Sequence, residues 1–570
     1  MTVIATAGHV DHGKSTLVRA LTGTDPDRLA EEKERGLTID LGFANLPLSR
    51  RRSISLIDVP GHIRFLRNML AGVGAVQGVL FVVSATEGWK PQSEEHLRIL
   101  DLLGLEHAVI AVTMADLVDT ELLELAVLDV EDHIVGTFAE GAPIVPVSGV
   151  TGHGIDELKS ALTGLFEAVG SARNRKAPRL WVDRSFSPTG TGTVVTGTLT
   201  DGELAVGDNI TVVPTREEGR VRTLQSHHRS VDVIKPGNRV AINLSGIGHA
   251  SVKRGDVLVH PDRWHSASII DAEIRVLPQM PQPLTRRGAF QTYIGSGEFS
   301  TRVRLLGGVD QLNPGATGKV RLYLDRPVPA LPGDRFVLRE SGRSQTVGGG
   351  RFLDIDPVVP AKAADPDGEP DRVLQERGWI DARHFAQLTG EERQPNLGAW
   401  LVSSEALAAA ESSIRERIAS AGELGLDIAL LDQRERALLD ARDDIVVDGG
   451  RATIGQAVSE FSDHPWLAEL DDDPFHPPAP DTVDRGEVRA MVRQGLVVET
   501  EGIFFSSAAV EQAAELIRVR LTEQDEGVTV ADVRDMLDTT RKYVLALLAH
   551  FDQNGRTRRR GDYRIAGPRL

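Results

Sequence analysis

The feature that most constrains this chain is an eight-residue motif close to its start. Residues 8–15 read Gly-His-Val-Asp-His-Gly-Lys-Ser and match the pattern GxxxxGK[ST]. The motif follows an apolar run typical of a buried strand, residues 3–7, and precedes a helical stretch, residues 16–21. In that context the glycines let backbone N–H groups turn inward and hold phosphate oxygens at a helix N-terminus. The motif therefore predicts a nucleotide-binding domain of the α/β type.

The polar residues of the motif have distinct predicted roles. Lys14 reaches the β and γ phosphates, and the Ser15 hydroxyl ligates Mg²⁺. The residues of this loop predicted to bind the nucleotide are Asp11, His12, Gly13, Lys14, Ser15 and Thr16. Over residues 1–172, short valine- and isoleucine-rich runs alternate with helical stretches, which predicts βαβ units around a parallel sheet. We assign these residues to one GTP-binding domain.

Two further segments fit around the γ-phosphate. Asp58 ends a strand-like run and can hold Mg²⁺ through a water molecule, and Gly61 can present its N–H to the γ-phosphate. His62 follows, where a side chain can orient the attacking water, and we predict that it is the catalytic residue. Thr38 lies in a segment expected to order only around the γ-phosphate. The predicted Mg²⁺ ligands are Ser15, Thr38 and, through water, Asp58.

Two loops predict which base is bound. Residues 113–116, Thr-Met-Ala-Asp, stand where NKxD would sit in a GTPase. Asp116 can accept from both the N1–H and the 2-amino group of guanine, which adenine does not offer in that arrangement. Met114 replaces the lysine that usually covers the base, and Thr113 replaces the asparagine that usually tethers the phosphate loop. Because Asp116 is present, we expect GTP and GDP to bind. The last base-contacting loop is predicted at Ser148, Gly149 and Val150.

The chain changes character after the nucleotide domain. From Pro178 to Asp356 many short β-branched runs are cut by glycine and proline, which predicts two small β-barrels. After a proline-rich segment, short helices alternate with brief β-like pieces, which predicts tandem winged helices. The predicted domains are β-barrels over residues 173–262 and 263–356, a linker over 357–370, three winged helices over 371–507 and a fourth over 508–570.

Composition predicts the setting in which the chain works. The 570 residues carry 64 basic and 82 acidic side chains, a net charge of −18, and no cysteine. The lack of cysteine rules out disulfides, thiolate metal sites and cysteine nucleophiles. The longest apolar run, residues 76–83, is far shorter than the roughly 20 residues that cross a bilayer. We expect a soluble, cytoplasmic, monomeric protein without a membrane partner.

The ordered nucleotide motifs and the histidine after DxxG resemble those of translational GTPases of the elongation factor Tu class. Residues 187–197 resemble the start of the second domain of those factors. More narrowly, residues 38–43, 183–186 and 346–350 are similar to the bacterial selenocysteine-specific elongation factor, as is the long C-terminal extension. The resemblance covers the whole chain, most strongly up to residue 356.

This resemblance implies a GTPase that delivers selenocysteinyl-tRNA to the ribosome at recoded UGA codons. Its core would hold GTP, Mg²⁺ and the aminoacyl-tRNA, while four winged helices would hold an mRNA hairpin. By position in the family motifs, Val10 and Leu37 would form an apolar gate beside His62. The implied lining of the pocket for the aminoacyl side chain is Asp40, Arg184 and Arg239.

The arginine pair also makes physical sense without the family. A selenol is largely ionised at neutral pH, whereas a serine hydroxyl is not. Two arginines therefore bind a selenolate strongly and gain little from serine, the amino acid on the precursor tRNA. The alternative is an ordinary pair of salt-bridging surface arginines. Asp40 would repel a selenolate unless it organises the arginines or receives the α-amino group.

Positive charge gathers at the C-terminal end of this acidic chain. Between residues 541 and 564 there are seven basic side chains and two acidic ones. Their positions predict the start of a recognition helix and a wing, two neighbouring surfaces that could grip one RNA stem or loop. The alternative is a solvated charge cluster, and residues 371–507 are expected to be a spacer. The predicted RNA-binding residues are Arg541, Lys542, Arg556, Arg558, Arg559, Arg560 and Arg564.

Two other functions stay open at this point. One is a Tu-like GTPase for another aminoacyl-tRNA or for initiator tRNA, which the long extension and the arginine pair disfavour. The other is a non-enzymatic winged-helix regulator with a degenerate nucleotide domain. Only Thr113 and Met114 support degeneration, whereas Lys14, Asp58 and His62 are all present.

Overall fold

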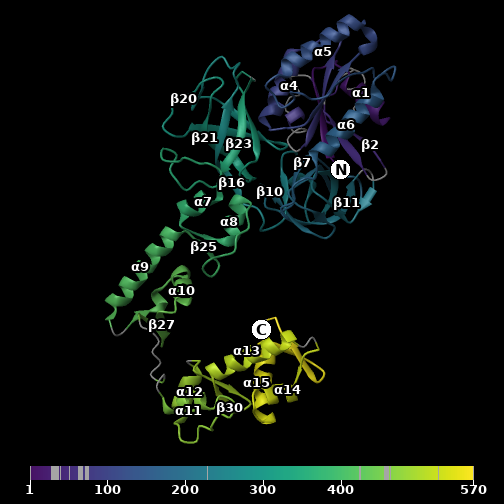
Figure 1. Cartoon of the computed structure of the whole chain (residues 1–570). Coiled ribbons are helices and arrows are strands. Elements are labelled where there is room, and N and C mark those ends of the chain that lie inside the picture. Colours follow the sequence, from purple (N-terminus) through teal and green to yellow (C-terminus); the bar gives the residue numbers. More distant parts are fainter. Residues whose placement is uncertain are drawn as a thin grey trace. The chain divides into compact units, whose positions relative to one another are not determined.

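The chain forms two compact units, Met1–Ala409 and Ala410–Leu570 (Figure 1). The first contains the nucleotide domain, two β-barrels and a small helical module, and the second contains further modules of helices and β-ribbons. The computed structural model describes residues 2–26, 38, 40–49, 52–61, 68–70, 76–226, 229–343, 345–422, 425–454, 461, 464–493, 495–523 and 526–568.

The nucleotide domain is built on a six-stranded sheet with the order β2-β3-β1-β4-β5-β6. Its strands are β1 (Thr2–Ala7), β2 (Gly42–Pro47), β3 (Ser53–Asp58), β4 (Gly78–Ser84), β5 (Ala108–Thr113) and β6 (Ile144–Pro146). Strand β2 is antiparallel to β3, and the other pairs are parallel. Strands β1, β3, β4 and β5 are buried along their whole length, as near-continuous apolar runs require. The predicted parallel α/β sheet is confirmed.

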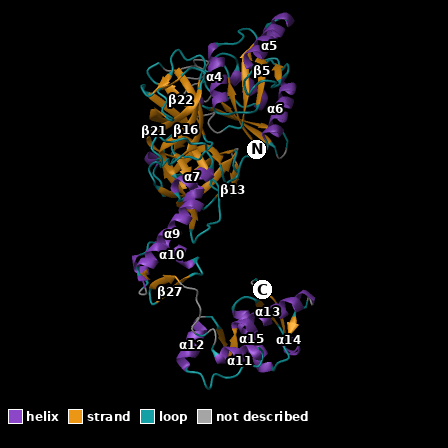
Figure 2. Cartoon of the chain, turned by 60° about the vertical axis from the view of Figure 1, so that its left-hand side comes forward, coloured by secondary structure: helices purple, strands orange, loops and turns teal. Residues whose placement is uncertain are grey.

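Helices cover both faces of this sheet (Figure 2). Helices α1 (Lys14–Thr22) and α6 (Ile155–Val169) share an apolar core with one face. Helices α4 (Pro91–Leu102) and α5 (Thr120–Ile134) share a second core with the other face. Leu277, Tyr293 and Val337 of the second barrel enter that second core, so the nucleotide domain and the second barrel pack directly on each other.

The first barrel is a ring closed by the pairing of β10 with β11. Its strands are β7 (Arg179–Phe186), β8 (Thr193–Thr200), β10 (Asn209–Val213), β11 (Glu218–Ser226), β14 (Asn238–Ser245) and β15 (Val257–Val259), with β12 (Arg229–Val231) beside β11 and a small pair made by β9 (Leu204–Ala205) and β13 (Val233–Ile234). Strands β7 and β14 flank β8, where Arg184 is opposite Thr196 and Arg239 is opposite Thr198. The topology therefore brings two arginines that are far apart in sequence to neighbouring positions.

The second barrel is a closed ring of six strands, in the order β16-β21-β19-β18-β22-β23. Its strands are β16 (Ser266–Val276), β18 (Phe290–Ile294), β19 (Gly297–Leu305), β21 (Thr317–Pro329), β22 (Arg335–Glu340) and β23 (Gln345–Asp354), with a small pair made by β17 (Leu284–Thr285) and β20 (Gln311–Leu312). Closure leaves the ring without an unpaired edge. The two predicted β-barrels are thus confirmed as folds.

A small module packs against the second barrel. It consists of α7 (Pro370–Arg377), β24 (Trp379–Asp381), α8 (Ala382–Thr389) and β25 (Trp400–Val402). Val373, Phe385 and Leu388 lie in the same apolar core as the barrel strands. The preceding proline-rich segment is held as well, because Arg321 donates to the carbonyl oxygen of Val359 at 2.8 Å. Burial of its apolar side chains fixes this first module to the barrel, and the spacer role expected for residues 371–507 stays a prediction.

The C-terminal part repeats the combination of helices and a β-ribbon, as predicted for winged helices. Its first elements are α9 (Ser404–Ser420), β26 (Leu426–Asp427), α10 (Gln433–Asp440), β27 (Ile445–Asp448) and β28 (Arg451–Ile454). Next come α11 (Pro465–Asp472), α12 (Arg485–Arg493), β29 (Val497–Thr500), β30 (Ile503–Ser506) and α13 (Ser507–Glu523). The last are β31 (Val528–Thr529), α14 (Val530–Met536), α15 (Arg541–Gln553), β32 (Thr557–Arg560) and β33 (Tyr563–Ala566).

The last module has the geometry of a recognition helix followed by a wing. Thr540 precedes α15, and β32 pairs with β33 to form the wing. Because Gly555 and Gly561 bound residues 556–560, the sequence predicts a turn there, and this prediction is wrong: residues 557–560 are strand β32, and the turn is at Gly561 and Asp562. The chain reverses at Gly561, where φ is 64°, so Arg558, Arg559 and Arg560 lie on the strand before the turn.

Candidate nucleotide site and a neighbouring arginine pair

The predicted nucleotide-binding loops meet at one edge of the six-stranded sheet. Parallel strands present their carboxyl ends at the same edge, and the loops there begin at Gly8, Asp58, Thr113 and Ser148. Gly8 has φ +132°, and a Cβ atom there would lie 2.1 Å from the carbonyl oxygen of Val82. Only glycine lets the phosphate loop pass this close to β4.

Lys14 is a buried side chain at the start of α1. Its Nζ donates to the carbonyl oxygens of His9 at 2.6 Å and Gly8 at 3.2 Å. A Cβ atom at Gly61 would lie 2.4 Å from this Nζ, so the segment after β3 approaches the lysine as closely as glycine allows. Lys14 and Gly61 are therefore brought together, the arrangement that two contacts to one γ-phosphate need.

Ser15 lies within hydrogen-bonding distance of both other predicted Mg²⁺ ligands. Ser15 Oγ donates to Asp58 Oδ2 at 2.7 Å and lies 2.8 Å from Thr38 Oγ1. Asp58 is fully buried, and its Oδ1 accepts from the Thr6 hydroxyl at 2.7 Å, which fixes the carboxylate at the end of β3. Two hydroxyls and a carboxylate fit a hard cation such as Mg²⁺, which takes oxygen ligands and keeps several waters.

Thr113 tethers the phosphate loop to the base-binding side of the sheet. Its Oγ1 donates to the carbonyl oxygen of His12 at 2.7 Å and lies 3.2 Å from that of Val83. Thr113 is buried at the end of β5. A threonine therefore makes, through its hydroxyl, the connection for which the sequence pattern led us to expect an asparagine.

Met114 and Asp116 follow directly on this tether. Met114 has φ 59°, and its Sδ accepts from the Ser84 hydroxyl at 3.3 Å. A Cβ atom at Gly13 would lie 3.9 Å from the Met114 methyl carbon, so the methionine reaches the phosphate loop. Asp116 is exposed, which leaves its carboxylate accessible to a base.

The third base-side loop lies against α1. The Ser148 hydroxyl accepts from the N–H groups of Val150 at 3.3 Å and Thr151 at 3.0 Å, which holds the turn. A Cβ atom at Gly149 would lie 3.2 Å from the Thr16 methyl carbon. Residues from three separate loops are thus gathered around one site, although the first and the last loop lie more than a hundred positions apart in the sequence.

Helix α4 supports the phosphate loop through two residues that sequence reasoning missed. The N–H of Gly8 donates to Nδ1 of His96 at 3.1 Å, and the N–H of Val10 donates to Gln92 Oε1 at 3.4 Å. Burial lowers the pKa of His96 to about 3, so the ring is neutral and can accept. His12, within the loop, donates from Nδ1 to the carbonyl oxygen of Val82 at 3.3 Å, and burial lowers its pKa to about 3 as well.

The predicted arginine pair converges on one aromatic ring. The guanidinium carbon of Arg239 lies 3.4 Å from the ring centroid of Phe43, and that of Arg184 lies 4.8 Å from it. Phe43 is on β2 of the nucleotide domain, whereas the arginines are on β7 and β14 of the first barrel. Asp40 lies beside this cluster, with its Oδ2 accepting from Arg184 Nη2 at 3.2 Å. The structure therefore brings Asp40, Arg184 and Arg239 together between two domains.

Two further charged residues belong to this cluster. Asp183 accepts from Arg239 through both carboxylate oxygens, at 3.0 and 3.2 Å. Arg254 donates to the second oxygen of Asp40 at 3.3 Å. Asp40 thus organises arginines, one of the two roles considered for it. The sequence analysis assigned no role to Asp183 or Arg254, because only the fold makes them neighbours of the cluster.

A cavity of about 390 Å³ opens beside Arg239. Residues from β2 and β3 line one wall, and residues from the first barrel line the other. The lining includes Phe43, Asn45, Ser55, Phe186, Thr196 and Gln225. A concave, partly apolar space next to two guanidinium groups can accept a small side chain that carries a negative charge.

Comparisons with known proteins agree with this architecture. The chain is 31% identical over 625 residues to the selenocysteine-specific elongation factor of Escherichia coli (strain K12), with 98% of each chain covered. The chain belongs to the family of selenocysteine-specific elongation factors. A second relative of that name, from Desulfomicrobium baculatum, is 43% identical over 351 residues, which cover 62% of this chain and 55% of that protein. The E. coli match carries the assignment because it spans both chains.

Family models match four parts of this selenocysteine-specific elongation factor. They are the elongation factor Tu GTP binding domain over residues 1–168, elongation factor Tu domain 2 over 192–259, the selenocysteine-specific elongation factor beta-barrel domain over 271–359, and the elongation factor SelB winged helix over 520–566. The protein is a translational GTPase that acts in elongation. The predicted family, GTPase activity and domain types are confirmed.

Solved structures give the same result for the fold. A crystal structure of bacterial selenocysteine-specific elongation factor EF-Sec covers 99% of both chains, with 26% identity and a TM-score of 0.69. Elongation factor SelB from Methanococcus maripaludis, in complex with the GTP analogue GppNHp, covers 63% of this chain and 80% of its own, with 26% identity and a TM-score of 0.55.

Two predicted residues of this family member lie outside the described residues. They are His62, the predicted catalytic residue, and Leu37, one of the two gate residues. Val10, the other gate residue, is half-buried in the phosphate loop. Among the described residues, no helix is both long enough and apolar enough to cross a membrane.

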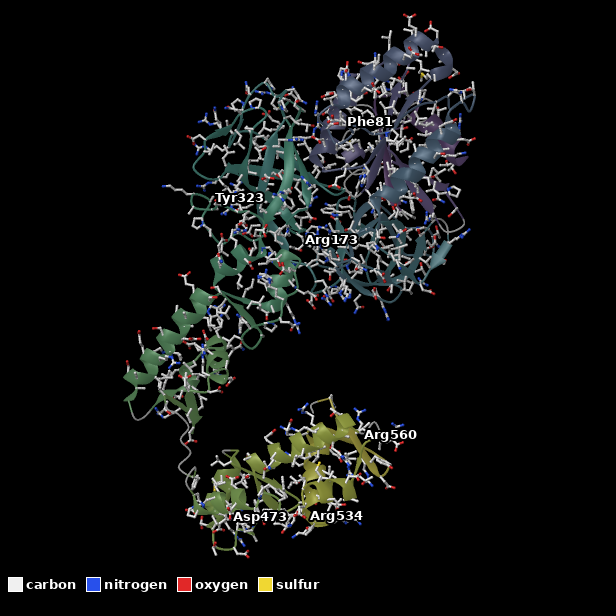
Figure 3. All side chains as sticks on the ribbon, in the orientation of Figure 1. Phe81, Arg173, Tyr323, Asp473, Arg534 and Arg560 are labelled. Carbon is white, nitrogen blue, oxygen red and sulfur yellow. The ribbon has the colours of Figure 1, made fainter. Side chains whose placement is uncertain are left out.

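The C-terminal basic residues divide into two groups. Arg564 is buried and donates to Asp552 at 3.2 Å, and Arg556 pairs with Glu511 at 2.6 Å. These two arginines hold the last module together. The exposed basic side chains are Arg541, Lys542, Arg558, Arg559 and Arg560, and Figure 3 shows Arg560 at the margin of this module.

Proposed function

We propose that this factor carries selenocysteinyl-tRNA and holds its selenolate between Arg184 and Arg239. The observation that carries the proposal is that both guanidinium groups lie on the ring of Phe43, 4.8 and 3.4 Å from its centroid, beside an open cavity. A selenolate placed there gains charge-assisted hydrogen bonds that a neutral serine hydroxyl cannot make. Selectivity then comes from the charge of the cargo rather than from its size.

The carboxylates around the arginines shape this pocket. Asp183 holds Arg239 from one side, and Asp40 holds Arg184 from the other. One guanidinium carries five N–H donors, so it can bind more than one acceptor at a time. The carboxylates therefore fix the direction in which the remaining donors point. A positioned donor costs less conformational entropy when the anion binds.

GTP binding and hydrolysis are proposed to use the converged loops of the nucleotide domain. Lys14 binds the β and γ phosphates, Thr113 holds the phosphate loop through His12, and Asp116 accepts from guanine. Ser15, Thr38 and, through water, Asp58 would hold Mg²⁺, which would supply positive charge to offset that of the phosphates. His62 is proposed to orient the attacking water once the ribosome positions it, with Val10 and Leu37 as the apolar gate.

We also propose that the last winged helix binds an mRNA hairpin. Support comes from five exposed basic residues at the start of α15 and on β32, which offer phosphate contacts from two neighbouring surfaces. If they contact RNA, glutamine at Arg558, Arg559 and Arg560 should reduce the slope of log affinity against log salt by about one per contact. An unchanged slope for hairpin binding would contradict this role. The factor would work as a cytoplasmic monomer on the ribosome.

The first test measures GTP-dependent binding of the full-length protein to selenocysteinyl-tRNA and to seryl-tRNA of the same tRNA species. The parent protein should prefer the selenocysteinyl form strongly, and Arg184→Ala or Arg239→Ala should remove most of this preference. The matched control is Arg222→Ala, which removes an exposed arginine from the same barrel. It should keep the preference.

Seryl-tRNA binding separates the two explanations of a loss. If the arginines recognise the selenolate, their removal weakens selenocysteinyl-tRNA binding and leaves seryl-tRNA binding nearly unchanged. If they hold the domains together, both tRNAs lose affinity in parallel. Equal binding of both tRNAs by the parent protein would place selectivity in the tRNA body and would overturn the pocket proposal.

A further inference from the structure

A second cavity, with several charged residues in its lining, is formed by residues far along the chain from the nucleotide-binding loops. Its volume is about 570 Å³, and three parts of the first unit line it: the segment before β7, the connection between the two barrels, and the module around α8. The lining residues used below are Arg175, Asp262, Arg263, Trp264, Arg383 and Glu392. Figure 3 labels Arg173, which lies on the same segment as Arg175.

Arg175 forms the inner wall of this cavity, and its charge is only partly balanced. Its side chain is 17% exposed. The nearby carboxylates Asp201 and Asp334 are both engaged by Arg179, which donates two hydrogen bonds to each at 2.5–3.2 Å. Arg175 Nε is 3.9 Å from Asp201 and is buried without a hydrogen-bond acceptor among the described residues. Burial, followed by nearby Arg173, lowers the pKa of Arg175 despite Asp201.

The mouth of the cavity adds positive charge. Arg383 is exposed and forms no ion pair with any residue that the structure describes. Arg263 is 3.5 Å from Glu392, and both side chains are more than half exposed, so water screens this pair. Asp262 is exposed at the same mouth. The cavity thus holds more cationic than anionic side chains.

The remaining groups that face the cavity do not reverse this balance. Arg393 is already paired with Asp371 and Glu391, at 2.5 Å each, so these carboxylates balance its positive charge. Trp264 adds an indole N–H that is buried and lacks an acceptor among the described residues. Both Trp264 and Arg175 therefore carry donors that an oxyanion entering the cavity could satisfy after a small side-chain rotation.

We propose that this cavity binds a phosphate group, held by Arg175 inside and by Arg383 at the mouth. Guanidinium groups suit phosphate because their planar N–H pairs match two of its oxygens. The phosphate comes either from an RNA backbone, a source that rests on the proposed role with tRNA and the ribosome, or from a free phosphate ion. In either case its binding fastens the module around α8 to both barrels, since all three contribute to the cavity walls.

The first arm of the test uses inorganic phosphate and the full-length protein. GDP and Mg²⁺ are kept saturating, so that the nucleotide site is filled, and chloride at the same ionic strength is the reference. Phosphate should raise the unfolding temperature of the parent protein in a saturable way. Arg175→Gln and Arg383→Gln should each weaken the apparent affinity for phosphate at least tenfold. Lys362→Gln, which removes an exposed charge elsewhere in the unit, should behave like the parent.

The second arm asks whether RNA supplies the phosphate. A photo-crosslinking amino acid replaces Gln394, an exposed lining residue, in a complex with GTP, charged tRNA and ribosomes. An RNA crosslink that disappears in Arg383→Gln supports the RNA source. A phosphate effect without an RNA crosslink supports the free ion. No saturable phosphate effect and no RNA crosslink would overturn the proposal.

Two controls keep the result interpretable. If Arg175→Gln is unstable, the test rests on Arg383→Gln, which is exposed and has no described partner to lose. GTP-dependent binding of selenocysteinyl-tRNA and seryl-tRNA is measured on the parent protein in parallel. Equal binding of both tRNAs together with a saturable phosphate effect would count against the proposed selenolate pocket and not against this cavity.

Discussion

Replacing Thr113 with valine removes one hydroxyl and leaves the shape of the side chain almost unchanged. Thr113 is 3% exposed, and its hydroxyl donates to the carbonyl oxygen of His12 at 2.7 Å and lies 3.2 Å from that of Val83. Valine fills the same space, so no cavity forms, but the buried acceptors lose this donor. Leaving a buried polar group unsatisfied costs about 1–3 kcal/mol.

Most of this cost should appear as weaker nucleotide binding, because His12 belongs to the loop that holds the phosphates. A loss of about 1–2 kcal/mol corresponds to about 5- to 30-fold in the dissociation constant. The assay titrates a fluorescent GTP analogue at constant Mg²⁺ and follows thermal unfolding of the nucleotide-free protein in parallel. Thr113→Ser keeps the hydroxyl and is the matched control.

Two results would refute this reasoning. If Thr113→Val binds GTP as tightly as the parent protein, the hydroxyl does not tether the loop. If Thr113→Ser is as weak as Thr113→Val, packing of the methyl group matters and the hydrogen bond does not. A loss of thermal stability without a loss of affinity would place the cost in β5 and not in the phosphate loop.

Three further predictions concern the same domain. His12 and His96 have pKa values near 3 in the fold against 6.5 when exposed, so the stability they contribute is complete above pH 6.5 and falls towards pH 3. At pH 5.5 each buried, neutral histidine should lower the unfolding free energy by about 1.4 kcal/mol. His96→Gln should roughly halve the pH dependence of the unfolding free energy measured by calorimetry. Gly8→Ala should lower GTP affinity more than tenfold, because its Cβ would lie 2.1 Å from a carbonyl oxygen. Gly23→Ala, at φ +71° with open space around it, is the control for backbone strain alone. His62→Ala should bind nucleotide and tRNA normally and fail in ribosome-stimulated hydrolysis; undiminished turnover would remove His62 from the mechanism.

The nucleotide site was the most predictable part of the molecule. Its loops follow apolar strands, and parallel strands must present those loops at one edge, so the convergence of Ser15, Thr38 and Asp58 follows from the order of the motifs. The glycine at position 8 was also readable as a close approach. The sequence pattern did not show which neighbouring atom requires a glycine at position 8. That atom is the carbonyl oxygen of Val82.

Residues that act through neighbours from distant strands could not be read from the sequence. Phe43, Asp183 and Arg254 complete the arginine cluster from three different parts of the chain, and the family-like segments that hold Phe43 and Asp183 did not show that these side chains meet the arginines. Their proximity depends on the pairing of β7 and β14 with β8 and on the docking of two domains. Sequence spacing carries no information about either.

Charge alone also misled at the C-terminus. Arg564 and the arginines at 558–560 look equivalent in sequence, but they lie on different strands of the wing, Arg564 on β33 and the others on β32. Arg564 faces the core and pairs with Asp552, whereas Arg558, Arg559 and Arg560 are exposed. A partner carboxylate twelve positions earlier was visible, but nothing in the pattern showed that the two would meet.

The segment that carries both Thr38 and Asp40 links the two halves of the proposed mechanism. Thr38 lies 2.8 Å from Ser15, and two residues later Asp40 pairs with Arg184 at 3.2 Å. Two residues span at most about 7 Å, so Thr38 cannot move far while Asp40 stays in place. We infer that loss of the γ-phosphate, by freeing Thr38, also withdraws the carboxylate that orients Arg184. GTP can then favour selenocysteinyl-tRNA binding only by the difference in tRNA affinity between the arrangements with and without the Asp40–Arg184 pair. Asp40→Asn weakens this pair. It should therefore reduce the GTP dependence of selenocysteinyl-tRNA binding more than it reduces GTP binding itself.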